Sequence, residues 1–94
     1  MKVKVSNVLT IAATLVYGHR EKTYGHPRDN FKTIVDMWNA YLTRRGIVTD
    51  ALIVERDVAM MFVLVKVARE GVAATRDNLV DIAGYAATAE RLDE

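Results

Sequence analysis

The sequence predicts an all-α fold, a four-helix bundle completed by dimerisation, in one domain over residues 1–94. Apolar residues recur at every third or fourth position in separate stretches, which is the period of an amphipathic helix. The breaks between these stretches are short, and the chain contains only one proline and five glycines. Hydrophobic residues make up 51% of the chain, more than so small a domain can bury by itself. We therefore expect a homo-oligomer, either a dimer or a larger assembly.

The first helix is expected to begin after Ser6 or Asn7, because either side chain can cap an N-terminus. Its apolar positions, spaced by three and four, run from residue 8 to residue 16. A polar connector is expected over residues 17–27, where both histidines and two Tyr-Gly pairs occur.

The second helix is expected to begin at Pro27, since proline suits the first turn of a helix. Arg44 and Arg45 suit its last turn, and Gly46 suits the left-handed position that follows. Its apolar residues form a single stripe: Phe31, Ile34, Val35, Trp38, Tyr41 and Leu42.

The third helix has two candidate beginnings, one capped by Thr49 and one near Glu55, and it is expected to end at Gly71. Nearly every residue from Val58 to Val67 is apolar, including Met60, Met61 and Phe62, which we interpret as packing residues. A helix that is apolar on all sides must be buried on all sides. This helix should therefore lie at the centre of the fold or in a subunit interface.

The fourth helix is expected to be capped by Thr75, with Asp77 in its first turn. Its apolar side contains Leu79, Val80, Ile82, Ala83 and Ala86. The charged residues at its end are expected to be solvated: Glu90, Arg91, Asp93 and Glu94.

Composition and charge also exclude several classes of function. Thirteen basic and twelve acidic residues give a formal charge of +1, so binding to nucleic acid is not indicated. The absence of cysteine excludes disulfides, thiolate zinc sites and cysteine nucleophiles. The longest apolar runs are too short to span a bilayer, so we expect a cytoplasmic protein with no membrane partner.

Four charged residues flank the break between the third and fourth helices. Lys66 and Arg69 share one helical face, and Asp77 and Asp81 share another. Antiparallel helices would bring the four together, beside Gly84, where a neighbour could approach closely. Two carboxylates one turn apart can bind Mg²⁺, and the two cations can bind phosphate. The alternative is a buried salt-bridge network that sets the register of the helices, which is the commoner arrangement.

A second cluster lies in the connector, where Tyr24, Gly25, His26 and Pro27 are consecutive. His26 and Tyr24 are candidate phosphate-binding residues, because histidine can exchange a proton or donate a hydrogen bond near neutral pH. A purely structural role at the start of the second helix is the alternative, and it is the commoner use of such residues. No catalytic residue is assigned.

Taken together, these motifs resemble a family of small uncharacterised bacteriophage proteins. The resemblance rests mainly on Tyr24-Gly25-His26-Pro27 and on the segment from Asp77 to Tyr85, and it covers about residues 7–92. It implies no particular activity.

The last helix also resembles, more distantly, the closing motif of MazG-like all-α nucleoside triphosphate pyrophosphohydrolases. In those enzymes carboxylates on two helices hold Mg²⁺, which activates a water for cleavage between the α- and β-phosphates. Asp81 matches their final aspartate, and Asn78 stands where a glutamate is expected. Lys66 and Arg69 stand where acids are expected, and only Glu70 is acidic there. The resemblance thus implies a nucleotide ligand with an incomplete set of metal ligands.

Three functions follow. The first is a nucleotide (NTP or dNTP) phosphate-binding or Mg²⁺-dependent pyrophosphohydrolase-like site, closed by the Tyr24–Pro27 segment. The second is a non-enzymatic homo-oligomer that binds a host or phage protein, with the charged cluster purely structural. The third and weakest is nucleic-acid binding by a dimer through five basic residues: Arg20, Lys22, Arg28, Arg44 and Arg45.

Overall fold

The computed structural model describes residues 6–47 and 52–94. Six helical elements occur in these ranges: α1 (Val8–Thr14), the π-helical η1 (Leu15–His19), α2 (Arg20–Tyr24), α3 (Pro27–Arg44), α4 (Glu55–Val72) and α5 (Arg76–Arg91). The first three form one continuous segment, so the described chain consists of four helical segments and has no strand. This confirms the all-α prediction. In the same ranges, no helix is both long and apolar enough to cross a membrane.

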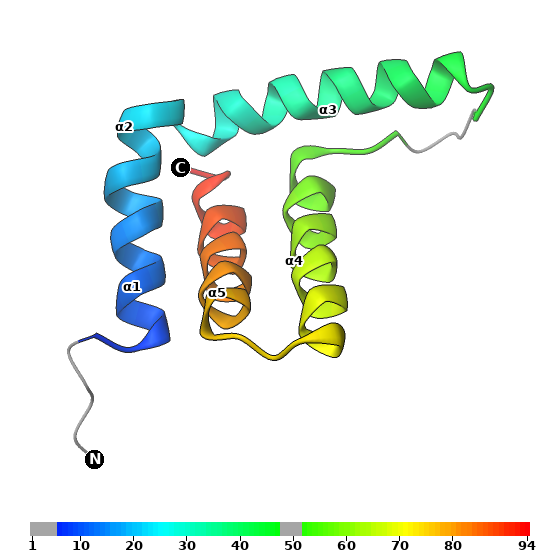
Figure 1. Cartoon of the computed structure of the whole chain (residues 1–94). Coiled ribbons are helices and arrows are strands. Elements are labelled where there is room, and N and C mark those ends of the chain that lie inside the picture. The colour runs from blue at the N-terminus through cyan, green and yellow to red at the C-terminus, as the bar shows by residue number, and fades with distance from the viewer. Residues whose placement is uncertain (1–5, 48–51) are drawn as a thin grey trace.

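Three of the segments form a layer, and the fourth lies across its end. The α1–α2 segment, α5 and α4 lie side by side with α5 in the middle, whereas α3 crosses the layer (Figure 1). We expected a four-helix bundle in which all helices run alongside one another. The difference arises at a sharp corner before Pro27, where Gly25 has φ +80° and His26 is extended. A left-handed φ costs glycine little, so the chain turns within two residues.

The polar connector expected over residues 17–27 is mostly helical, which corrects the prediction. Its first residues belong to the π-helical turn η1, whose wider backbone changes the i→i−4 hydrogen-bond pattern. The guanidinium of Arg91 is buried against this turn, and its Nη1 donates to the carbonyl of Val16 at 3.0 Å. Helix therefore continues to Tyr24.

Most predicted helix boundaries are confirmed. The side chain of Asn7 accepts hydrogen bonds from the first turn of α1, and Thr75 caps α5. Gly46 follows α3 with φ +79°, and α4 begins at Glu55. The alternative beginning at Thr49 lies outside the described residues.

The core lies where α3, α4 and α5 meet. Its buried residues are Phe31, Val35, Val58, Ala59 and Ala89. The ring of Phe62 joins the three helices, because it contacts Phe31 and Trp38 of α3 and stacks on Tyr85 of α5 at a centroid distance of 5.0 Å.

Burial on all sides of α4 is not observed within one chain. Val58 and Ala59 are fully buried, but Leu64 is 64% exposed, and Met60 and Met61 are exposed rather than core residues. The helix also continues one residue beyond the expected end. The outward side of α4 is therefore apolar and uncovered by the described residues of this chain.

Candidate functional site

A cleft of about 220 Å³ lies between the α2–α3 corner and helices α4 and α5. One wall comes from the Tyr-Gly-His-Pro motif and contains Tyr24, Gly25 and Pro27. The opposite wall contains Tyr85, which belongs to the other motif singled out in the sequence. Arg20 lines the cleft as well, and we call this space the corner cleft. Two motifs about sixty residues apart thus face one cavity.

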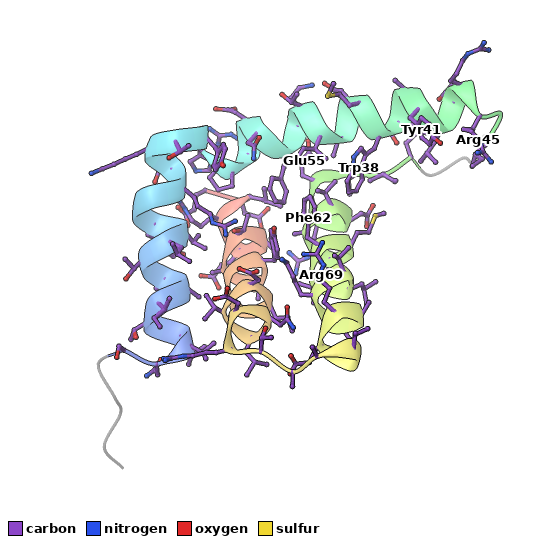
Figure 2. The ribbon with its side chains drawn as sticks, viewed as in Figure 1. Trp38, Tyr41, Arg45, Glu55, Phe62 and Arg69 are labelled. Atoms are coloured by element: carbon purple, nitrogen blue, oxygen red, sulfur yellow. The ribbon has the colours of Figure 1, made fainter. Side chains whose placement is uncertain are left out.

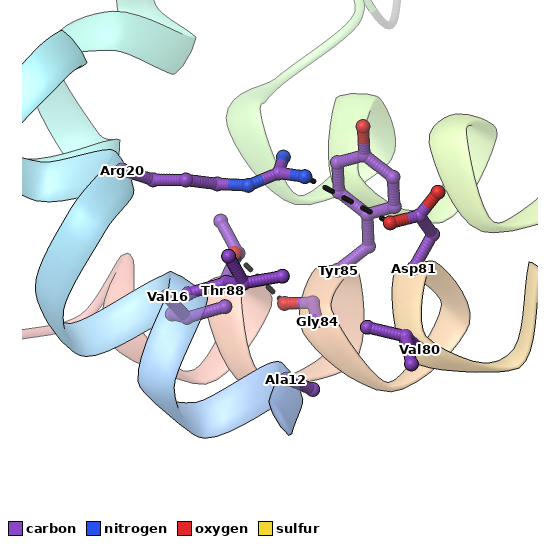
Figure 3. A pocket seen from close by; sticks show the side chains of 9 residues that line it. Ala12, Val16, Arg20, Val80, Asp81, Gly84, Tyr85 and Thr88 are labelled. Atoms are coloured by element: carbon purple, nitrogen blue, oxygen red, sulfur yellow. Dashed lines mark hydrogen bonds and ion pairs between the residues drawn. The ribbon is translucent and has the colours of Figure 1, made fainter. Parts of the chain in front are cut away.

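The ion pairs of Asp81 lie beside the corner cleft and share Arg20 with it, whereas Asp81 and Lys66 do not line the cleft. Its Oδ2 lies 2.9 Å from Nζ of Lys66, and its Oδ1 lies 3.8 Å from Nη2 of Arg20. The Lys66 and Asp81 side chains are only 16% and 22% exposed, whereas Arg20 is 44% exposed. Figure 3 shows Arg20 extending from α2 toward Asp81, past the ring of Tyr85. Two cations and one anion leave this Asp81 cluster with a net charge of +1.

Beneath Arg20 the helices pack closely around Gly84. Its carbonyl accepts a hydrogen bond from Thr88 at 2.8 Å, and the small pocket beside it is lined by Arg20, Asp81 and Tyr85 (Figure 3). A methyl group on Gly84 would lie 3.7 Å from Val16, which is ordinary contact. Space alone therefore does not require glycine here.

Arg91 of α5 contacts the α2 side of the cleft through Glu21. Its side chain is 6% exposed and lies 3.1 Å from Glu21 and 3.4 Å from Glu94. The guanidinium also lies over the ring of Tyr17, 4.7 Å from its centroid. The hydrogen bond to Glu21 raises the pKa of Arg91 above its ordinary value. The expectation of a solvated Arg91 is wrong, because this side chain reaches back to the π-helical turn.

The other predicted site residues lie apart from the Asp81 cluster. Arg69 and Asp77 are exposed, so the four charges flanking the helix break do not all converge. Glu70 instead accepts a hydrogen bond from the side chain of Asn78 at 3.1 Å. His26 caps α3, since its Nδ1 accepts from the backbone N–H of Arg28. A phosphate-binding role for Arg69 or His26 stays a prediction.

The carboxylates of the described residues are poorly placed to hold a metal ion. Within the described ranges, no three His, Asp or Glu side chains are grouped closely enough to hold a metal ion. Asp81 is already paired with Lys66 and Arg20, and Asp77 points to solvent. A carboxylate with two cationic neighbours is a weak metal ligand, because the metal must displace those cations.

Sequence reasoning did not identify Arg20 as the second cation of the Asp81 cluster. Arg20 precedes the Tyr-Gly-His-Pro motif by four residues and belongs to the pattern that resembles the phage family, but the only contact predicted for it is with nucleic acid. An (i, i+4) relation to Tyr24 could have signalled a shared face. Because a loop was expected there, that relation carried no weight.

Comparison with known proteins gives a family. The model of a domain of unknown function, DUF6378, matches residues 7–93. The chain belongs to the DUF6378 family. The Gene 55 protein of Mycobacterium phage D29 is 40% identical over 89 residues, which cover 94% of this chain and 54% of that protein. The Gene 55 protein of Mycobacterium phage L5 is 36% identical over 88 residues, covering 92% of this chain and 52% of that protein.

These relatives confirm the resemblance to a family of small phage proteins. The chain spans about half the length of the curated relatives that it matches. No solved structure matches the chain.

Proposed function

We propose that the corner cleft binds a nucleotide, an NTP or a dNTP, with its phosphates at Arg20 and Lys66. One observation carries the proposal: Arg20 and Tyr24 of α2 line the same cleft as Tyr85 of α5. Ligand sites are concave and mostly apolar, with a few convergent polar groups. The corner cleft combines aromatic side chains with the guanidinium of Arg20, and its one carboxylate, Glu21, is paired with Arg91.

The Arg20 side of the cleft suits a phosphate group. Arg20 is accessible from solvent, and a guanidinium can bind two phosphate oxygens at once. At 3.8 Å its pairing with Asp81 is loose, so a phosphate can compete for it. Lys66 lies on the far side of the same carboxylate and adds a second positive charge. Arg69 and His26 remain predicted phosphate contacts beyond this pair.

The other end of the cleft suits a base or another flat apolar group. Tyr24 is 64% exposed at the rim, so its side chain is free to close over a ligand. Phe31, Phe62 and Tyr85 supply aromatic surface within the cleft. Aromatic side chains bind bases by stacking without selecting one base strongly.

Metal-dependent hydrolysis is the part of the MazG-like expectation that these residues support least. A Mg²⁺ ion was predicted at Asp77 and Asp81, but the first is exposed and the second is paired with two cations. The residues do not fit a preformed Mg²⁺ site. We therefore propose nucleotide binding without a metal-dependent step, in the cytoplasm of the phage host.

Thermal stability measured across a panel of nucleoside triphosphates, with and without Mg²⁺, tests this proposal. A ligand at ten times its dissociation constant stabilises by about 1.4 kcal/mol and raises Tm by roughly 6–11 °C in a domain of this size. Arg20→Gln should remove the shift. Arg44→Gln, which makes the same charge change at the exposed end of α3, should retain it. If no nucleotide at millimolar concentration shifts Tm, the proposal fails.

A second candidate function rests on the uncovered apolar side of α4. In that case the chain is a non-enzymatic homo-oligomer that binds a host or phage protein, and the Asp81 cluster only fixes the helices. The two candidates differ at Arg20, whose replacement should change ligand binding in the first case and leave protein binding intact in the second.

A further inference from the structure

The second apolar face of α4 has no partner among the described residues. Five of its residues follow helical spacing on the side opposite the core: Met61, Leu64, Val65, Ala68 and Val72. We call these residues the outer stripe. Leu64 is 64% and Val72 is 90% exposed, and none of the five carries a charge. A helix with apolar residues on two opposite sides requires a partner on each.

The outer stripe continues into a groove beneath the projecting half of α3. This groove, about 410 Å³ in volume, is lined by Trp38, Tyr41, Leu42, Ile53 and Met61. Figure 1 shows α3 extending beyond α4, and Figure 2 shows Trp38 on the side of α3 that faces α4. The stripe and the groove together form an L-shaped apolar surface.

We propose that a second copy of this chain covers the surface, with the two α4 helices antiparallel across a two-fold axis near Leu64. The exposed area indicates an uncovered interface. A monomer of 10.5 kDa exposes about 5,400 Å² on average, whereas this chain exposes 6912 Å². The surplus exceeds the approximately 800 Å² that each partner buries in a standard stable interface.

The composition of the stripe also indicates a second copy rather than a different protein. Interfaces between transient partners are about as polar as the remaining surface, whereas homodimer interfaces are more apolar and lack charges at their centre. The outer stripe is apolar and uncharged, as the centre of a homodimer interface is. In a two-fold symmetric dimer the same patch of both copies forms the interface, so no complementary surface is needed elsewhere on the chain.

The antiparallel arrangement follows from the position of α3. With the axis near Leu64, each α3 overhang lies at the opposite end of the paired helices, and the two overhangs do not meet. Val72 of the second copy then lies eight residues, or about 12 Å, beyond the axis. This position is near the N-terminal end of the first copy's α4, close to the groove beneath α3. The groove thus offers an apolar site for the exposed valine of the second copy.

Sedimentation equilibrium and light scattering test the proposal on the full chain. The wild-type chain should have twice the mass of one chain at micromolar concentration. Leu64→Asp should raise the dissociation constant at least about 30-fold, the loss typical of a central interface residue. Leu9→Asp is the matched control, because Leu9 on α1 is 71% exposed and outside the stripe, and it should leave the dimer intact.

If Leu64→Asp does not fold, disulfide cross-linking of two copies at position 64 tests the same interface. The chain has no cysteine, so Leu64→Cys introduces a single thiol. Oxidation should join two copies at this position within the dimer, and Leu9→Cys should not cross-link. A wild-type chain that remains monomeric throughout the micromolar range would overturn the proposal. A dimer that neither Leu64→Asp weakens nor Leu64→Cys cross-links would overturn it as well.

Discussion

Replacing Arg91 with methionine tests how the fold positions the corner cleft. Methionine keeps an unbranched apolar stem, so the change mainly removes the guanidinium and its polar contacts. Those contacts hold the π-helical turn, and the turn sets the direction in which α2 presents Arg20 to Asp81. The variant should therefore be less stable and should also bind ligand less well.

The expected loss of stability follows from the contacts of Arg91. Its hydrogen bond to the carbonyl of Val16 is buried and charge-assisted, and such bonds contribute about 1.5–3 kcal/mol. The Glu21 and Glu94 side chains are 40% and 50% exposed. Water can therefore solvate both carboxylates once Arg91 is removed, and their ion pairs contribute only about 1 kcal/mol or less to the free energy of unfolding. Arg91→Met should thus lower the free energy of unfolding by about 3 kcal/mol.

Urea denaturation followed by circular dichroism at 222 nm measures this change. Wild type and variant should be compared at one protein concentration, because self-association adds to apparent stability. Glu21→Gln is the control that removes one ion pair and leaves the bond to Val16, and it should cost less than about 1 kcal/mol. A loss below about 1 kcal/mol for Arg91→Met, or equal losses for both variants, would refute the reasoning.

Four further variants test other contacts by the same denaturation assay. Asp81→Asn should cost about 2 kcal/mol, between the values for exposed and fully buried pairs, because Lys66 is left half-buried without a carboxylate. Asp36→Asn, which breaks an exposed ion pair within α3, should change stability by less than about 0.5 kcal/mol; equal effects of the two would contradict the burial argument. Gly25→Ala should destabilise by roughly 1–2 kcal/mol, because its φ of +80° strains any other residue, and an unchanged midpoint would contradict this. Asn39→Ala should cost about 2 kcal/mol, since its side chain both accepts from and donates to the backbone ahead of α4; a loss near zero would show that this backbone finds water instead.

Helix existence and most boundaries could be predicted from the sequence because their causes are local. The cap at Thr75, the proline at the start of α3 and the glycine at its end act within a few residues. The helix over residues 17–24 was missed because its cause is not local. It depends on Arg91, which is more than seventy residues away in sequence from the carbonyl of Val16.

The candidate site could be predicted only in part for the same reason. The spacing of Lys66 and Asp81 on adjacent antiparallel helices predicted one ion pair, which the structure contains. Spacing on a single helix could not show that Arg69 and Asp77 face solvent, since this depends on how α4 and α5 are rotated about their axes. Arg20 joins the cluster through the corner at Gly25, and no helical period encodes such a corner.

The most direct test of the central claim is to map where a nucleotide binds. Titration of a nucleoside triphosphate into ¹⁵N-labelled chain, followed by amide chemical shifts, reports every site at once. The corner cleft predicts saturable shifts concentrated at Arg20, Tyr24 and Tyr85, with smaller shifts at Lys66. Shifts confined to the exposed basic end of α3, or none at millimolar nucleotide, would contradict the assignment of the corner cleft as a nucleotide site.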